Sequence, residues 1–215
     1  ARPTDSDSDG DGLLDSWEIN GYDPNGDGIP EVDLPAMGAD PQHKDIFVEV
    51  DYMENASHSH RPDLKAIQAI VRAFNNAPIP NPNDETGIHL HVDFGPDSPL
   101  TWGQAATWGS LSNSQAIIHQ DNVSTCDISG DRPLLRWAGF DTIKDSQTDN
   151  ERNFSENRRN IFHYNLWVHR LCLEMGNAGI SRNRLTEPEF AMGGSDFIVS
   201  FGDTSGTLTQ QAATF

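Results

Sequence analysis

The stretch DIFVEVDYM, residues 45–53, decides the fold of this chain of 215 residues. Its side chains fall into two alternating sets, with Ile46, Val48, Val50 and Tyr52 on one side and Phe47, Glu49, Asp51 and Met53 on the other. A period of two over this length is typical of a β-strand. The run therefore predicts a strand.

Two patterns that follow this strand predict its neighbours. After Pro62, apolar residues recur at helical spacing: Leu64, Ile67, Ile70, Val71 and Phe74. The run from Gly87 to Phe94 again alternates, with Ile88, Leu90, Val92 and Phe94 on one side and His89, His91 and Asp93 on the other. We expect two neighbouring strands of one sheet with a helix packed across them.

The rest of the chain extends this sheet. Residues Ile161 to Leu171 and Asp196 to Phe201 predict further strands. The polar stretch from Asp141 to Asn160 predicts a surface excursion, and Thr207 to Phe215 resembles the start of a helix. The expected fold class is α+β (mixed α/β), a twisted mixed sheet with a backing helix. We expect residues 1–40 to form an EF-hand-like calcium-loop segment and residues 41–215 to form the α/β domain that contains this sheet.

Charge excludes some classes of partner. The net charge is −19, and residues 1–54 carry fifteen Asp and Glu against two Lys and Arg. This acidity argues against nucleic-acid binding, which needs a basic surface. No apolar run approaches the length of a membrane span. Acidic residues interspersed with Gly instead favour a site for a hard cation.

Residues 7–18 fit a twelve-residue calcium loop at every position. Such a loop supplies oxygens from positions 1, 3, 5, 7, 9 and 12 and needs Gly at position 6. Gly12 fills position 6, and Leu14 is the apolar residue at position 8. The predicted ligands of the first calcium ion are Asp7, Asp9, Asp11, the carbonyl of Leu13, Asp15 and Glu18.

A second loop repeats the opening of the first one. Its predicted ligands are Asp23, Asn25, Asp27, the carbonyl of Ile29, Glu31 and Asp33. Position 12 is Leu34, which has no ligating side chain, so Asp33 next to it would substitute. A plain Asn-Gly turn is the alternative. Trp17 and Tyr22 are interpreted as packing anchors between the two loops.

No catalytic residue follows from the sequence. The chain contains no His-Glu-x-x-His pattern, no Gly-x-Ser-x-Gly pattern and no phosphate loop. The pairs His58 and His60, and His89 and His91, have the spacing of one strand face and could bind a metal. We interpret them as polar strand faces, and His163 and His169 as structural. Cys126 and Cys172 either form a disulfide, lie in the core as thiols, or pair elsewhere.

Seven segments in order carry a resemblance to a known family. They are DSDGDGLLDSWEINGYDPNGDG, HKDIFVEVDYM, GIHLHVDFGP, RRNIFHYNLWVHRLC, GISR, SDFIVSFG and QQAATF. Together they resemble secreted metzincin-type zinc metallopeptidases that carry calcium loops ahead of the catalytic domain. In that family, a segment like QQAATF leads into a helix with His-Glu-x-x-His-x-x-Gly-x-x-His, which carries the three zinc ligands and the general base.

The resemblance implies an extracellular protein whose complete form hydrolyses protein or peptide substrates. None of the family's zinc ligands matches a position in these 215 residues, so Zn²⁺ is expected only in a complete enzyme. A second chain carrying the zinc helix is one possible partner. These residues alone are expected to be inactive. The alternative is a non-catalytic extracellular module that binds calcium and presents an interaction surface.

Overall fold

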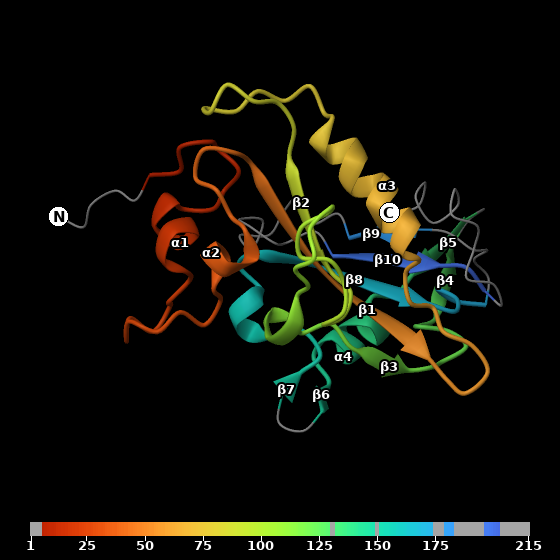
Figure 1. The fold of residues 1–215 in the computed structure, drawn as a ribbon. Helices are drawn as coiled ribbons and strands as arrows, with labels where there is room; N and C mark the ends of the chain where they lie inside the picture. The colour runs from red at the N-terminus through yellow and green to blue at the C-terminus, as the bar shows by residue number, and fades with distance from the viewer. Residues whose placement is uncertain (1–5, 130–131, 149–150, 174–178, 183–195, 203–215) are drawn as a thin grey trace.

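One mixed β-sheet forms the centre of the computed structural model, which describes residues 6–129, 132–148, 151–173, 179–182 and 196–202. The strand order among these residues is β2-β1-β8-β10-β9, and β3 pairs with β1 off this path. Figure 1 shows helix α3 above this sheet and α4 below it. The sheet strands are β1 (Asp45–Glu54), β2 (His89–Asp93), β3 (Ala116–Ile118), β8 (Phe162–Val168), β9 (Gly179–Ser181) and β10 (Phe197–Ser200).

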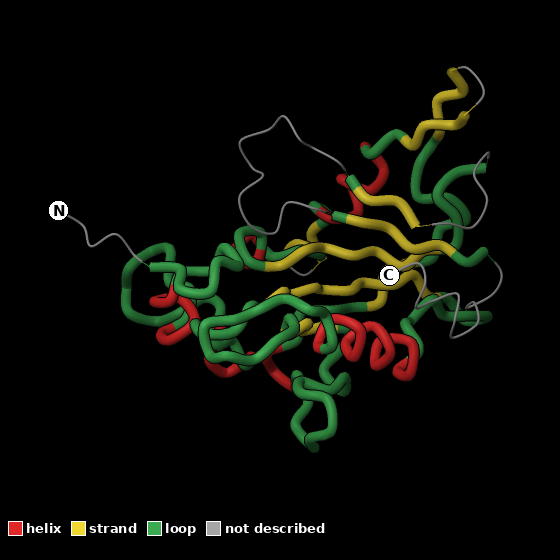
Figure 2. The backbone as a smooth tube through the Cα atoms, turned by 90° about the horizontal axis from the view of Figure 1, so that it is seen from above, coloured by secondary structure: helices red, strands yellow, loops and turns green. Residues whose placement is uncertain are grey.

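Shorter elements surround the sheet. The helices are α1 (Asp15–Asn20), α2 (Leu34–Met37), α3 (Leu64–Asn75) and α4 (Ala138–Lys144), with 3₁₀ turns at Gly109–Leu111 and Glu156–Arg158. Two small hairpins pair β4 (Cys126–Ser129) with β5 (Arg132–Leu135), and β6 (Gln147–Thr148) with β7 (Glu151–Arg152). Figure 2 shows the sheet strands side by side and the N-terminal loops at one end of them. The expected mixed α/β fold with a mixed sheet is confirmed.

Strand β1 is the centre of the sheet. It runs parallel to β2, β3 and β8, and β10 continues the parallel set beyond β8. Helix α3 begins after Asp63, whose carboxylate accepts a hydrogen bond from the backbone N–H of Lys65 at 2.7 Å. Its buried side chains Ile67 and Ile70 pack in one cluster with Val48 of β1. The predicted strand–helix–strand unit is therefore confirmed, as are the strands predicted near 161–171 and 196–201.

The face of β1 opposite α3 contains buried charge. Glu49 and Asp51 are fully buried there, between the apolar side chains of Phe47 and Met53. Tyr164 of β8 donates a hydrogen bond to Asp51 Oδ2 at 2.8 Å. Burial raises the pKa of Glu49 to about 7, against the opposing effect of Arg158. Because buried carboxylates are costly without partners, this face requires compensating groups from elsewhere in the chain.

Arg158 supplies the main compensation, although it lies in a stretch that we expected at the surface. Its Nη1 lies 2.6 Å from Glu49 Oε2 and 2.8 Å from Asp93 Oδ2, and the residue is 3% exposed. Phe154 and Asn153 in the same stretch are also buried. The surface prediction for Asp141 to Asn160 is wrong at these positions, because the polar groups there pair with polar groups inside the protein.

The N-terminal segment is joined to the sheet by apolar packing. Its buried side chains share one cluster with Phe47 and Phe162 of the sheet: Leu13, Tyr22, Val32, Leu34 and Met37. Trp17 and Tyr22 meet edge to face with ring centroids 4.9 Å apart, which confirms them as packing anchors. A disulfide joins Cys126 to Cys172. The helix expected at Thr207 to Phe215 lies outside the described residues, and within them no helix has the length and apolarity to cross a bilayer.

The buried ion pair predicts a large stability loss in Arg158→Met. The substitution keeps the length of the side chain but leaves Glu49 and Asp93 buried without their cation. We expect the free energy of unfolding to fall by about 3–5 kcal/mol, measured by urea denaturation. Arg136→Met is the control, since its pair with Asp127 is exposed and should contribute less than about 1 kcal/mol. Equal losses in the two variants would contradict this reading of the core.

Candidate metal centre

The first acidic loop folds around its own carboxylates. Asp7 accepts hydrogen bonds from the backbone N–H groups of Gly10 and Gly12 at 2.8 and 3.2 Å. Asp9 accepts one from the N–H of Asp11, and Asp11 accepts one from the N–H of Leu13. Gly12 has a φ of 99°, a conformation that favours glycine. Three carboxylate oxygens, one each from Asp7, Asp9 and Asp11, thereby lie within 4.8 Å of one another.

Glu18 brings a buried carboxyl group to this loop. It sits in α1, is 2% exposed, and neither carboxylate oxygen has a hydrogen-bond partner among the described residues. Its carboxylate lies within 4.8 Å of ligand atoms of Asp11 and Asp45. Burial, with Asp11, Asp9 and Asp45 nearby, raises the pKa of Glu18 to about 9. A cation bound between these groups would give Glu18 the partner that it lacks among the described residues. It would also offset the repulsion between the neighbouring carboxylates.

Asp45 is a member of this site that sequence reasoning missed. Its backbone N–H donates to Asp11 Oδ2 at 2.8 Å across a separation of 34 residues. Its carboxylate is buried, which opposes ionisation, but hydrogen bonds from His89 and His91 lower its pKa below the usual value. Lys44, the preceding residue, donates to the carbonyl of Asp9. The first residues of the central strand therefore pack directly against the acidic loop.

Asp15, predicted at position 9, lies apart from this cluster. Its carboxylate accepts hydrogen bonds from the N–H of Ser8 at 2.7 Å and from the hydroxyls of Ser6 and Ser8. These bonds lower the pKa of Asp15. Position 9 of such loops often reaches calcium through a water molecule. Asp15 therefore closes the loop onto itself rather than joining the group of Asp7, Asp9 and Asp11.

The second loop reproduces the backbone of the first one. Asp23 accepts from the N–H groups of Gly26 and Gly28, Asn25 from that of Asp27, and Asp27 from that of Ile29. These four bonds match those of the first loop at a constant offset of sixteen residues. The repeat in the sequence is therefore also a repeat in three dimensions.

The second loop lacks the closing part of the site. Ile29 is 72% exposed, whereas its counterpart Leu13 is 5% exposed and packs in the core. The Asp33 carboxylate accepts a hydrogen bond from the N–H of Ala36 at 3.1 Å and so caps α2. Glu31 accepts a hydrogen bond from the side chain of Asn25. No group of three His, Cys, Asp or Glu ligand atoms gathers in this loop among the described residues.

The histidine pairs noted in the sequence meet partners from distant segments. His58 and His60 lie beside His119 and His169, and His89 and His91 lie beside Asp45. His91 Nε2 is 2.5 Å from Asp45 Oδ1, and its ring stacks on Phe47. The interpretation as a polar strand face holds for His89 and His91, which lie on β2. It is wrong for His58 and His60, which lie in the loop after β1, with His60 buried. In both cases the partners come from distant segments that the sheet brings together.

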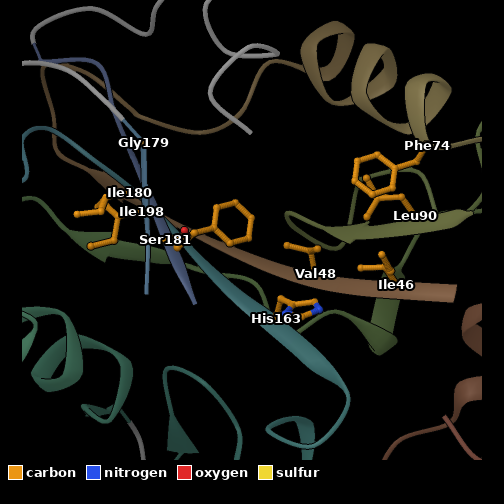
Figure 3. Close-up of a pocket in the computed structure, with 10 residues that line it drawn as sticks. Ile46, Val48, Phe74, Leu90, His163, Gly179, Ile180, Ser181 and Ile198 are labelled. Carbon is orange, nitrogen blue, oxygen red and sulfur yellow. The ribbon is translucent and has the colours of Figure 1, made fainter. Parts of the chain in front are cut away.

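An open groove lies on the same side of the sheet as α3. It has a volume of about 400 Å³ and is lined mainly by apolar side chains of β1, β2, α3, β9 and β10 (Figure 3). Among its lining residues, His163 is the one titratable side chain. Among the described lining residues, the groove is therefore mainly an apolar surface.

The geometry predicts that Glu18→Gln weakens calcium binding more than Asp33→Asn. Glu18 is buried beside Asp11, whereas Asp33 is exposed and caps a helix. We expect the dissociation constant to rise by at least about tenfold in Glu18→Gln, or ~1.4 kcal/mol, and to stay within about twofold in Asp33→Asn. Isothermal titration with Ca²⁺ measures both. A stronger effect of Asp33→Asn would move the main site to the second loop.

Comparison with known proteins adds no assignment to this geometry. No protein-family model, curated protein or solved structure matches the chain. The chemistry of the site therefore rests on its own residues: converging carboxylates in the first loop, a buried Glu18 without hydrogen-bond partners among the described residues, and Asp45 at the start of the central strand.

Proposed function

We propose that the loop from Asp7 to Glu18 binds one Ca²⁺ ion that stabilises this domain. The observation that carries the proposal is Glu18, which is 2% exposed with no hydrogen-bond partner for either oxygen among the described residues. Proteins rarely bury a carboxylate without a hydrogen bond or a counter-ion. Carboxylate and carbonyl oxygens in a loop of this spacing are the ligands that calcium prefers.

The residues that would hold the ion are Asp7, Asp9, Asp11, Glu18 and the carbonyl of Leu13. Bound calcium supplies positive charge to a site where Asp45 also contributes a buried carboxylate. The protein's own groups fix the position of the loop: Asp11 accepts from the N–H of Asp45, and Leu13 packs in the core. Calcium binding would therefore stabilise the contact between the N-terminal segment and the start of β1.

The larger function that we propose is the N-terminal part of a secreted, calcium-stabilised zinc metallopeptidase. The ordered segments that resemble this family support the proposal, and the disulfide fits an extracellular protein. These 215 residues contain no His-Glu-x-x-His pattern, so neither zinc ligands nor a general base of that kind are assigned here. In this proposal the zinc helix lies either in a continuation of the chain or in a second chain, and the substrate is a protein or peptide.

A non-catalytic calcium-binding module is the second candidate. The observation that favours it is the well-formed acidic loop, which packs against the start of the central strand. In this reading calcium orders a surface for another extracellular protein. The two candidates share the calcium site and differ in whether peptide hydrolysis appears when the zinc helix is supplied.

Calcium should raise the melting temperature of the chain. At a concentration of 100 times the dissociation constant, a ligand stabilises the folded state by about 2.7 kcal/mol. For a domain of this size, that corresponds to a rise of about 5–10 °C. Calorimetric melts with Ca²⁺ and with chelator measure the shift. Mg²⁺ at the same concentration is the control ion, and identical melts in Ca²⁺ and chelator would disprove the proposed site.

The chain alone should not cleave casein. Zinc hydrolysis of peptides requires protein ligands, an open coordination position for water, and a base. We expect proteolysis only when the chain is extended past Phe215 or mixed with a second chain that carries the zinc helix. Chelator-sensitive cleavage by the 215 residues alone would contradict the family proposal. Absence of cleavage in all three preparations would favour the non-catalytic module.

A further inference from the structure

Four histidines converge beyond the carboxyl ends of three parallel strands. His119 follows β3 directly, His169 follows β8 directly, and His58 and His60 lie in the loop after β1. Strands β3 and β8 both run parallel to β1, so their carboxyl ends meet at one edge of the sheet. This edge is where ligands commonly bind in open α/β sheets.

The four rings form a tight group. All six distances between their ring centroids lie between 4.5 and 5.7 Å. Each ring offers one nitrogen, and these four atoms lie within 4.8 Å of one another. His60 is 2% exposed and His169 is 6% exposed. Four imidazoles from three segments of the chain therefore present nitrogen atoms to one small region, and two of the four rings are buried.

The backbone around the group is fixed by the end of β1. The N–H of His60 donates to the carbonyl of Met53 at 2.9 Å, and the N–H of His119 donates to that of Glu54 at 3.2 Å. The carbonyl of His169 accepts from Gly202 at 2.7 Å. These bonds hold segments from three parts of the sequence in place, so the histidines are positioned by the sheet itself.

Hydrogen bonds around His58 select the tautomer that a metal requires. Asn55 Oδ1 accepts from the N–H groups of Ser57 and His58, which identifies this atom as oxygen. The Ser57 hydroxyl must therefore donate its proton to Asn55 Oδ1, at 2.6 Å. His58 Nδ1, 3.0 Å from Ser57 Oγ, is then the donor of that pair. The lone pair of neutral His58 is left on Nε2, which is buried without a hydrogen-bond partner among the described residues.

We propose that His58, His60, His119 and His169 bind one transition-metal dication, with Zn²⁺ as the best fit. Imidazole nitrogens suit Zn²⁺ and do not suit Ca²⁺, which takes oxygen ligands. Four nitrogens at about 2.0–2.1 Å from a tetrahedral Zn²⁺ lie about 3.3 Å from one another. The four histidine nitrogens, which already lie within 4.8 Å of one another, would need to move only slightly closer together to bind the ion. The link from His58 through Ser57 to Asn55 is the kind of supporting hydrogen bond that orients metal-binding histidines.

This ion would have a structural role and would be distinct from the zinc of a peptidase. Four protein ligands fill a tetrahedral shell and leave no position for a water molecule. The site joins the ends of β1, β3 and β8. We therefore expect a bound ion to increase the stability of the fold and not to take part in hydrolysis. It also revises the expectation that zinc occurs only in a complete enzyme. The proposal does not depend on the calcium site or on the family.

A second group, Asp45 with His89 and His91, is the competing position for a zinc ion. Its ligand atoms also lie within 4.8 Å of one another. However, Asp45 Oδ1 already pairs with His91 Nε2 at 2.5 Å, and Asp45 Oδ2 accepts from the N–H of Asp40 at 2.8 Å. Asp45 also lies against the calcium loop. The test must therefore separate the two groups.

The test is titration of Zn²⁺ into the full 215-residue chain, first stripped with chelator and then saturated with Ca²⁺. We expect calorimetry to show a zinc site whose affinity falls at least 100-fold in His169→Gln and in His119→Gln. Co²⁺ in place of Zn²⁺ should give the visible absorption of a tetrahedral site, and this absorption should be lost in the same variants. His163→Gln, in the strand that His169 directly follows, is the matched control and should bind as the parent chain does.

Two further variants keep the proposal testable if the buried histidines prove necessary for folding. His58→Gln alters a half-buried loop residue, and Ser57→Ala removes only the supporting hydroxyl, for which we expect about a tenfold loss of affinity. Circular dichroism checks the fold of each variant. Zinc binding that is unchanged in His58→Gln and His119→Gln would overturn the proposal. So would binding that is lost in His89→Gln instead, since that result assigns the ion to the Asp45 group.

Discussion

Carboxylates buried along one face of the central strand β1 constrain the rest of this structure. Asp45, Glu49 and Asp51 point to the same side of the strand and are all buried. Each carboxylate meets a different partner: His91 for Asp45, Arg158 for Glu49, and Tyr164 with the backbone of Gln115 for Asp51. Because an unpaired buried charge costs several kcal/mol, these partners determine how the segments that cover this face are placed.

The same strand connects the two proposed metal sites. Its first residue, Asp45, contacts the acidic loop, and the histidine group lies beyond its last residue, Glu54. A strand of ten residues separates its ends by about 30 Å. The site at the amino end is made of oxygens and the site at the carboxyl end of nitrogens, so the two ends would select different ions.

The two acidic loops share a backbone fold but differ in their contacts with the rest of the protein. Their four backbone hydrogen bonds correspond one to one, yet among the described residues only the first loop gathers three carboxylates. Leu13 anchors that loop in the core, and Glu18 enters the site from helix α1. In the second loop Ile29 is exposed and Asp33 serves as a helix cap. Part of this difference is in the sequence, since Asn25 stands where the first loop has Asp9. The burial of Leu13 and Glu18 comes from tertiary packing, which a twelve-residue pattern does not encode.

The sequence by itself determined the features that depend on neighbours along the chain. The period of two at residues 45–53 predicted β1, and the helical period after Pro62 predicted α3. The Asp-x-Asp-x-Asp-Gly spacing predicted the turns of the first loop. These patterns are readable because strand faces, helix faces and tight turns are local geometries. Only the tertiary structure decided the rest. Glu49 and Arg158 are 109 residues apart, and the four histidines come from three separate segments. Such groups meet because parallel pairing aligns strand ends, and no spacing in the sequence records which ends become neighbours.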